Sequence, residues 1–204
     1  MVIMIVCSGE DYSPDKIKQY AAEANYIIAC DGGTDILLKC GIKPDMVMGD
    51  MDSTKMLGEI EQGGWEVIRF PREKDYTDSE LAIQKALEMK PKHIYMFAAT
   101  GSYVDHSLVN IIAIVRNAPI CEIVTSNAVI SFKTESFEFE NGINRRFSLF
   151  PITDVKNIRL IGAKYQYPKS DLVPWEFSLG NEGIAETVKV EFDSGSMLLV
   201  LFDK

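Results

Sequence analysis

The sequence predicts an α/β N-terminal domain with a mostly parallel sheet and flanking helices, followed by an all-β antiparallel sandwich or barrel. Up to about residue 126, short apolar runs alternate with segments of helical period, which is typical of parallel strands joined by crossover helices. Beyond that point apolar and polar residues alternate with period two, which is typical of half-buried antiparallel strands. We therefore expect one domain over residues 1–126 and a second over residues 127–204.

Short apolar runs predict the strands of the first domain. Helix-period segments separate most of these runs, so consecutive strands are expected to run parallel to one another. The runs are Val2–Val6, Tyr26–Cys30, Met46–Met48, Trp65–Phe70, His93–Ala99 and Cys121–Thr125.

Capping signals predict where several helices of this domain begin. Ser13 followed by Pro14 predicts a helix with a serine N-cap and a proline in its first turn. The stretch "TDSE" at residues 77–80 predicts a capping box, in which Thr77 caps the helix and Glu80 reaches back to it. The last helix is predicted by apolar residues at i, i+3, i+4 and i+7, namely Leu108, Ile111, Ile112 and Val115.

Two turn signals interrupt the alternating pattern of the second domain. "SFEFE" at residues 136–140 is followed by Asn141-Gly142, which predicts a hairpin leading into "FSLF". Later, alternating apolar residues at 188–192 are followed by Asp193-Ser194-Gly195, where the chain is expected to turn and return along residues 197–202.

Composition restricts the class of protein. The 204 residues are 47% apolar and 25% charged, which is ordinary for a globular protein, and the net charge of −9 argues against a nucleic-acid partner. No apolar run is long enough to cross a bilayer, and residues 1–7 are too short and lack the basic flank of a signal peptide. We therefore expect a cytoplasmic protein with no membrane segment. Because no CxxC spacing occurs, we expect reduced and mostly buried cysteines at Cys7, Cys30, Cys40 and Cys121.

Aspartates follow the predicted parallel strands. In an open α/β sheet, the loops after the strands line one crevice, where ligands usually bind. Carboxylates gathered there would repel one another unless cations are present, and Mg²⁺ prefers oxygen ligands. The sequence therefore predicts a magnesium-dependent site that includes Asp31, Asp50, Asp52, Asp75, Asp78 and Asp105.

Each of these features also has a purely structural interpretation. A single aspartate after a strand often caps a helix or forms a turn, and Asp78 could merely oppose a helix dipole. Asp50 and Asp52 are harder to explain in this way, because residues i and i+2 of an extended chain point to the same side. For Thr77 and Glu80 the capping role is favoured.

Phosphate binding has no familiar fingerprint in this sequence. Neither GxGxxG nor GxxxxGK[ST] occurs. Glycine-containing turns at residues 31–33 and 100–102 could present backbone N–H groups to an anion, although for either loop taken alone a tight turn is the preferred interpretation. Lys74 and His106 are candidate phosphate partners or ordinary polar residues.

Four motifs in this order resemble those of thiamine pyrophosphokinase: "DGG" (31–33), "KPDMVMGDMDS" (43–53), "KDYTDSELA" (74–82) and "TGSYVDHSLVN" (100–110). The resemblance covers essentially the whole chain. It implies a Mg²⁺-dependent transfer of the diphosphoryl group of ATP to the hydroxyl of thiamine, giving thiamine diphosphate and AMP. It also implies a homodimer whose C-terminal sandwich helps to bind thiamine at the subunit interface.

The resemblance further implies roles for individual residues. Catalysis is implied for Asp50, Asp52, Asp75 and Asp78, and metal binding for Asp50, Asp52 and Asp78. ATP contacts are implied for Asp31, Gly32, Gly33, Lys74, Thr77, Gly101, Ser102, Asp105 and His106. Thiamine contacts are implied for Trp175, Ser178 and Asn181, although Trp175 is equally explained as a core residue.

Two departures from the family pattern keep other functions open at this point. The chain has Ser102-Tyr103 where the family has Gly-Arg, and its "SLGNE" at 178–182 is shorter than the family's loop. The missing arginine leaves open a non-catalytic nucleotide-sensing module. The stretch "DMDST", which approaches the "DxDGT" of haloacid-dehalogenase-like phosphatases, leaves open a phosphatase.

Overall fold

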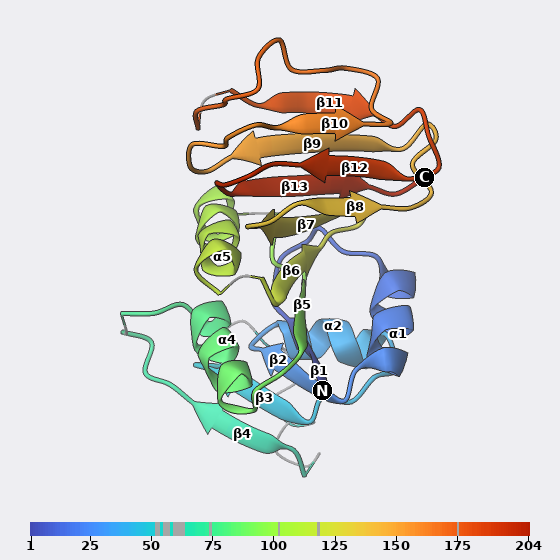
Figure 1. The fold of residues 1–204 in the computed structure, drawn as a ribbon. Coiled ribbons are helices and arrows are strands. Elements are labelled where there is room, and N and C mark those ends of the chain that lie inside the picture. Colours follow the sequence, from blue (N-terminus) through green and yellow to red (C-terminus); the bar gives the residue numbers. More distant parts are fainter. Residues whose placement is uncertain are drawn as a thin grey trace. The chain divides into compact units, whose positions relative to one another are not determined.

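The computed structural model describes residues 1–51, 54, 58, 64–73, 75–101, 103–117, 119–174 and 176–204 (Figure 1). The chain divides into two compact units, Met1–Ser126 and Asn127–Lys204. The first unit contains a parallel sheet with helices and the second contains antiparallel sheets. The predicted fold class is therefore confirmed.

The first unit is built on a parallel sheet in the order β6-β5-β1-β2-β3-β4. The central strand β1 is fully or almost fully buried along most of its length, as expected for a strand covered on both faces. The strands, which agree closely with the predicted runs, are β1 (Val2–Val6), β2 (Tyr26–Cys30), β3 (Met46–Gly49), β4 (Glu66–Arg69), β5 (His93–Phe97) and β6 (Cys121–Val124).

Helices cover both faces of this sheet, with α1 and α2 on one side and α4 and α5 on the other (Figure 1). They are α1 (Pro14–Glu23), α2 (Gly33–Lys39), α4 (Asp78–Glu88) and α5 (Val104–Arg116). No helix within the described ranges is long and apolar enough to cross a membrane.

The predicted helix caps are confirmed. The Ser13 hydroxyl accepts a hydrogen bond of 3.4 Å from the backbone N–H of Lys16, and Pro14 occupies the first helical position of α1. At the start of α4, the Thr77 hydroxyl accepts from the Glu80 N–H at 3.2 Å, and the Glu80 carboxylate accepts from the Thr77 N–H at 3.0 Å. This is the reciprocal capping box that the sequence predicts.

Helix α5 forms as predicted, but it buries a different face from the one its apolar pattern indicates. Leu108 and Ile112 are 56% and 50% exposed, whereas Asn110, Ala113 and Ile114 are buried. Asn110 can lie inside because its side-chain amide is hydrogen-bonded there. The apolar period therefore predicts the helix correctly but not its orientation.

The second unit consists of two antiparallel sheets, in the orders β11-β9-β13-β7 and β10-β12-β8. Its core includes Phe147, Leu149, Val188 and Met197, all fully buried. The strands are β7 (Ala128–Lys133), β8 (Phe137–Phe139), β9 (Arg146–Pro151), β10 (Arg159–Ile161), β11 (Ser178–Glu182), β12 (Val188–Glu191) and β13 (Met197–Phe202).

The two turns of this unit do not join neighbouring strands, so the expected hairpin at Asn141-Gly142 is wrong. Strand β8 pairs with β12, whereas β9 pairs with β11 and β13. The turn at 193–195 likewise leads from β12 in one sheet to β13 in the other. An alternating pattern identifies the buried face of a strand but not its partner, so both turns instead connect the two sheets.

Candidate active site

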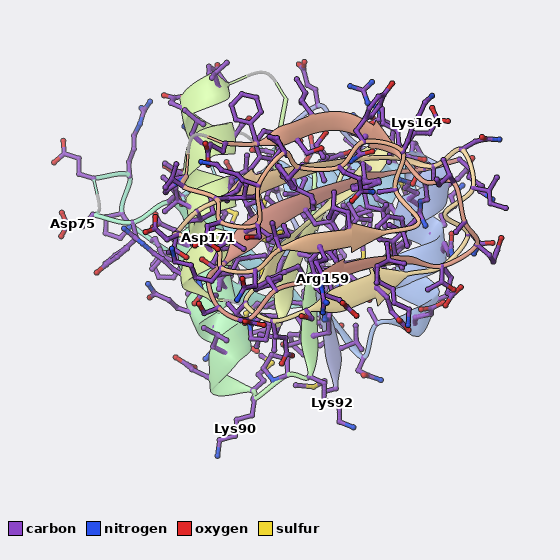
Figure 2. The ribbon with its side chains drawn as sticks, turned by 45° about the horizontal axis from the view of Figure 1, so that its top comes forward. Asp75, Lys90, Lys92, Arg159, Lys164 and Asp171 are labelled. Atoms are coloured by element: carbon purple, nitrogen blue, oxygen red, sulfur yellow. The ribbon has the colours of Figure 1, made fainter. Side chains whose placement is uncertain are left out.

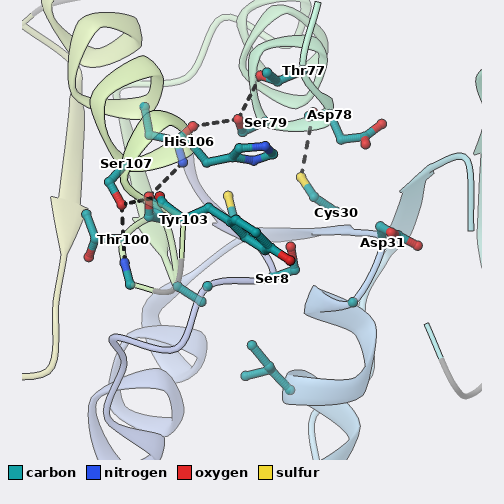
Figure 3. Close-up of a pocket in the computed structure, with 18 of the residues that line it drawn as sticks. Ser8, Cys30, Asp31, Thr77, Asp78, Ser79, Thr100, Tyr103, His106 and Ser107 are labelled. Carbon is teal, nitrogen blue, oxygen red and sulfur yellow. Dashed lines mark hydrogen bonds between the residues drawn. The ribbon is translucent and has the colours of Figure 1, made fainter. Parts of the chain in front are cut away.

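A pocket of about 1160 Å³ lies among the loops at the carboxyl ends of the strands in the first unit (Figure 3). Its lining comes from the loops after β1, β2, β3, β4 and β5, from α2, and from the N-terminal parts of α4 and α5. Because β2 and β5 pair with opposite edges of β1, the strand order reverses direction at β1. This is the position at which open α/β sheets usually bind ligands.

The loops after β1 and β5 lie backbone against backbone at this point. The Gly9 N–H donates to the Ala98 carbonyl at 2.7 Å, and a Cβ added to Gly9 would lie 2.3 Å from the Thr100 carbonyl oxygen. A Cβ added to Gly101 would lie 2.7 Å from the Glu10 nitrogen. Only glycine fits such an approach. Gly9 was missed in the sequence analysis, although a glycine placed just after a buried strand could have indicated it.

Four of the predicted aspartates line this pocket: Asp31, Asp50, Asp75 and Asp78. Asp31 is buried and has a left-handed backbone with φ of 47°, a conformation uncommon outside glycine. Asp78 begins α4, and Figure 3 shows its side chain and that of Asp31 in the same pocket. Asp75 is exposed on the loop that projects from the first unit (Figure 2).

A short hydrogen bond secures the chain after Asp50. The Thr54 hydroxyl donates to Oδ1 of Asp35 at 2.6 Å, and both side chains are buried. Asp35 belongs to α2 and lines the pocket. The loop that follows β3 is thereby fixed to α2. Asp35 was missed in the sequence analysis, because no local pattern in residues 33–39 shows that this carboxylate faces the interior.

A second polar connection joins α4 to the end of β5. The Ser79 hydroxyl donates to Oδ1 of Asn110 at 2.6 Å, and Nδ2 of Asn110 donates to the Ala99 carbonyl at 2.7 Å. All three residues line the pocket. Since Ser79 follows Asp78 directly, this connection sets the position of the Asp78 backbone relative to the loop after β5.

Asp11 joins the loops that follow β1, β5 and β6. Its Oδ1 accepts from the backbone N–H and the hydroxyl of Ser126, at 3.1 and 2.5 Å, and its Oδ2 accepts from the Thr100 hydroxyl at 3.0 Å. Burial raises the pKa of Asp11, but the hydrogen bonds from Ser126 and Thr100 and the charge of Lys16 outweigh it, leaving the pKa below its ordinary value of 3.8. The ionised form of Asp11 is therefore the one that stabilises the loops.

The start of α5 contributes aromatic side chains to the pocket. Tyr103 is the N-cap residue, and its ring centroid lies 5.6 Å from that of His106, both rings lining the pocket (Figure 3). The Ser107 hydroxyl donates to the Tyr103 carbonyl at 2.9 Å and accepts from the Gly101 N–H at 3.3 Å. The pocket thus has an aromatic surface next to a glycine turn.

Two cysteines also line the pocket. Cys30 is the last residue of β2 and Cys7 follows β1 directly. A hydrogen bond with Cys7, together with burial, raises the pKa of the Cys30 thiol well above its ordinary value. The Cys30 thiol also contacts the Asp78 carbonyl oxygen at 3.8 Å. All four cysteines of the chain are free, with Cys40 half-exposed and the others buried.

Most of the predicted ATP contacts in the described residues meet in this pocket, but Gly33 and Asp105 do not. A Cβ added to Gly33 would lie 2.0 Å from the Val6 carbonyl oxygen, so this glycine allows α2 to pack on β1. Oδ1 of Asp105 accepts from the His106 N–H at 2.9 Å, outside the lining. The lining includes Asp31, Gly32, Thr77, Gly101 and His106. Asp52, Lys74, Ser102 and Trp175 lie outside the described residues.

In the second unit, the predicted thiamine contacts Ser178 and Asn181 lie on β11. Asn181 is fully buried. Its Oδ1 accepts from the Tyr165 N–H at 3.1 Å, and its Nδ2 donates to the Tyr165 carbonyl at 2.9 Å and to the Ser178 hydroxyl at 3.2 Å. The Asn181 side chain therefore holds the neighbouring segment in place, while Ser178 remains partly exposed.

Comparisons with known proteins identify the family of the chain. Residues 17–125, which contain all four motifs, match the model of the thiamin pyrophosphokinase catalytic domain. A thiamine pyrophosphokinase of Bacillus subtilis (strain 168) is 33% identical over 171 residues, which cover 80% of each chain. The chain belongs to the thiamin pyrophosphokinase family.

Solved structures of this family share the whole fold. The crystal structure of a thiamine pyrophosphokinase from Bacillus subtilis has a TM-score of 0.88 at 26% identity and covers 100% of both chains. That of a thiamin pyrophosphokinase from Geobacillus thermodenitrificans has a TM-score of 0.85 at 25% identity and covers 100% of this chain and 98% of its own. The phosphatase and sensor alternatives are not favoured by these matches.

Replacing Asp11 by alanine is expected to lower the free energy of unfolding by about 1–3 kcal/mol at pH 7, because hydrogen bonds to an ionised group are lost. Since the pKa of Asp11 is lowered in the folded chain, its contribution is fully present above about pH 4 and is lost as the pH falls below that value. Urea unfolding of Asp11→Ala and of the native chain should thus differ at pH 7, and the difference should shrink as the pH falls from 4 through the lowered pKa of Asp11. The control is Asp154→Ala, which removes an exposed carboxylate. An Asp11→Ala deficit that stays constant between pH 7 and pH 3 would contradict the charged role.

Proposed function

We propose that this chain transfers the diphosphoryl group of ATP to the hydroxyl of thiamine, giving thiamine diphosphate and AMP. The observation that carries the proposal is the acidic pocket at the strand-order reversal of the first unit, lined by Asp31, Asp50, Asp75 and Asp78. Membership of the thiamin pyrophosphokinase family supports it. In the reaction, the hydroxyl oxygen of thiamine attacks the β-phosphorus of ATP, the bond from that phosphorus to the α,β-bridging oxygen breaks, and the hydroxyl proton is released.

The nucleotide phosphates are proposed to bind along the glycine turns of the pocket. Gly32 and Gly101 bring bare backbone into the lining, and the first turns of α4 and α5 open onto the same space. His106, beside Gly101, is the proposed side-chain donor to phosphate. Tyr103 offers an aromatic face at the position where the family has an arginine, so adenine stacking is available there.

The donor groups of the pocket fit Mg²⁺. This ion usually takes one or two carboxylates together with substrate phosphates and water, so it does not require a closed set of protein ligands. Consistently, no three His, Cys, Asp or Glu side chains among the described residues form such a closed set. We propose that Asp50, Asp52 and Asp78 hold Mg²⁺, which when bound neutralises charge on the triphosphate.

The remaining side chains are proposed to position the reacting groups. Asp31 and Asp75 complete the acidic lining, Asp35 with Thr54 fixes the loop after Asp50, and Asn110 fixes the start of α4. Transfer of a phosphoryl group through a loose transition state depends mainly on alignment and charge neutralisation, so no general base is assigned. A fixed geometry of these loops is therefore what the reaction needs from the chain.

We propose that the second unit binds thiamine, with Ser178 in contact with the substrate and Asn181 supporting the strand that carries it. Asn181 is buried and hydrogen-bonded to the chain at residue 165, which favours this division of roles. Trp175, which lies outside the described residues, remains the proposed aromatic contact. The two units would then be the ATP-binding and thiamine-binding domains. We further propose a cytoplasmic protein without nucleic-acid partners, in keeping with its net charge of −9.

Incubation of the purified chain with ATP, Mg²⁺ and thiamine is expected to release AMP and thiamine diphosphate in equal amounts. Chromatography of the nucleotides and thiamine compounds measures both products. A phosphatase would instead release inorganic phosphate without thiamine, and a sensor module would leave ATP intact. Either of those outcomes would disprove the proposed reaction.

Replacing Asp50 or Asp78 by asparagine is expected to lower kcat by about 10²–10³-fold, the usual effect of removing one group that stabilises transition-state charge. Folding should be unchanged or slightly more stable, because the variant relieves repulsion among neighbouring carboxylates. Steady-state kinetics over a range of Mg²⁺ concentrations, with thermal unfolding, measures both effects. The matched control is Asp15→Asn, which alters an exposed aspartate of α1 away from the pocket. Near-native kcat in both pocket variants would show that these aspartates are structural.

We propose that the chain is a homodimer, because each unit exposes large apolar side chains. On α5, Val104, Leu108 and Ile112 are 50–72% exposed, and on β11 Leu179 is 66% exposed. Sedimentation equilibrium of the native chain is expected to give twice the monomer mass, and Leu108→Lys or Leu179→Lys is expected to weaken association. A monomer at micromolar concentration would contradict the proposal.

A further inference from the structure

Cys7 and Cys30 occupy neighbouring positions at the carboxyl ends of two adjacent strands. Strands β1 and β2 are paired in parallel, with Val6 opposite Ala29. The residues that follow these two are Cys7 and Cys30. Paired residues of adjacent strands point to the same side of a sheet, and the strands lie about 4.8 Å apart. The two thiols therefore project to the same side of the sheet.

Both cysteines line the acidic pocket. Their residues are only 6% and 3% exposed, so a reagent reaches them through this pocket rather than from the outer surface. The Cys30 thiol lies 3.8 Å from the carbonyl oxygen of Asp78, and Figure 3 shows the two residues side by side. A group bound to these thiols would consequently lie next to the proposed metal and phosphate site.

We propose that Cys7 and Cys30 form a dithiol site for a sulfur-binding centre that carries two replaceable oxygen ligands. A trivalent organic arsenical represents this class of ligand. Two thiols at adjacent strand positions match the two bonds that such a centre makes. The site is separate in chemistry from the carboxylates of the pocket, because sulfur ligands select soft centres and carboxylates select hard ones.

The binding reaction balances without any oxidant. In water the arsenical carries two hydroxyl groups on arsenic. Two As–O bonds break and two As–S bonds form, and each thiol proton leaves with a hydroxyl group as water. The oxidation states of arsenic and sulfur do not change. The structure thus needs to supply only the two thiols.

The number of available ligands favours this class over zinc. Structural zinc sites use four nitrogen or sulfur ligands. Within the described part of the chain, no three His, Cys, Asp or Glu side chains are placed to hold a metal ion. A trivalent arsenical that already carries one carbon substituent is fully coordinated by two thiols.

The site is tested by titrating the native chain with phenylarsine oxide and measuring the adduct by mass spectrometry under native conditions. We expect one arsenical per chain, retained against a monothiol and removed by 2,3-dimercaptopropanol. Cys7→Ala and Cys30→Ala are each expected to lose this retention, whereas Cys40→Ala, which alters the half-exposed cysteine at the end of α2, keeps it. Circular dichroism checks that each variant is folded. Absence of the adduct in the native chain, or equal retention by the Cys7 and Cys30 variants, overturns the proposal.

A second measurement needs no variant. The arsenical-treated native chain is alkylated with one reagent, freed of arsenic with 2,3-dimercaptopropanol, unfolded and alkylated with a second reagent of different mass. Trypsin then separates Cys7, in residues 1–16, from Cys30, in residues 19–39. The control sample receives no arsenical but otherwise passes through the same steps, so that protection by arsenic is distinguished from protection by burial. A further arsenical-treated sample is digested directly, without alkylation. In this sample we expect a mass that corresponds to these two peptides joined through arsenic. Linkage through Cys40 or Cys121 instead overturns the assignment.

Competition with the nucleotide follows from the proposed function and is tested separately from the site itself. Saturating ATP with Mg²⁺ is expected to slow capture of phenylarsine oxide several-fold, and the adduct is expected to abolish release of AMP. Capture by Cys7 and Cys30 does not depend on activity, so a chain that captures the arsenical but never makes AMP contradicts only the proposed function. Capture at an unchanged rate, in a chain shown to bind ATP, overturns the overlap of the two sites.

Discussion

The backbone contact between the loops after β1 and β5 is the constraint on which the pocket depends. Gly9 and Ala98 are joined at 2.7 Å, and neither Gly9 nor Gly101 has room for a side chain. At a reversal of strand order, the loops after neighbouring parallel strands lead to opposite faces of the sheet, and a crevice remains between them. Because Gly9 and Gly101 carry no side chain, their backbone can approach closely while both residues line the pocket.

Buried polar side chains then convert this crevice into a fixed arrangement. Asp11, Asp35 and Asn110 each connect two or more segments that are distant in the sequence, and each does so with hydrogen bonds of good length. None of them is among the four predicted aspartates of the pocket, although Asp35 and Asn110 also line it. Repulsion between carboxylates on different loops tends to push those loops apart, and these hydrogen bonds oppose that movement. These bonds keep the segments that carry the pocket carboxylates in fixed positions.

Much of the fold could be predicted because its signals are local. The strands of the first unit, the Ser13 cap and the Thr77–Glu80 capping box depend on neighbouring residues, and the structure agrees with each. Strand partners in the second unit could not be predicted, because pairing depends on distant segments that an alternating pattern does not identify. The buried face of α5 was likewise decided by the hydrogen bonds of Asn110 rather than by the apolar period.

The acidic lining could be predicted in part for a similar reason. Position at a strand end was sufficient to bring Asp31, Asp50 and Asp78 to the pocket, since parallel strands share an edge. Asp105 does not line the pocket and bonds to its own helix. The same reasoning missed Asp11 and Asp35, whose roles depend on partners far along the chain. Pocket residues close to a strand end can therefore be predicted from one sequence, whereas the hydrogen bonds that support them cannot.

The central position of β1 has a consequence for how the protein is made. Val2 pairs with His93 in β5, and Asp11 bonds to Ser126, the last residue of the first unit. During synthesis the chain emerges from its N-terminus, so β1 must wait for β5 before its second edge is covered, and the loop beside it must wait longer still for Ser126. The nascent chain exposes an unpaired apolar strand edge throughout this interval, which makes it a target for aggregation or for chaperone binding. The ligand pocket is completed only when the whole first unit has left the ribosome.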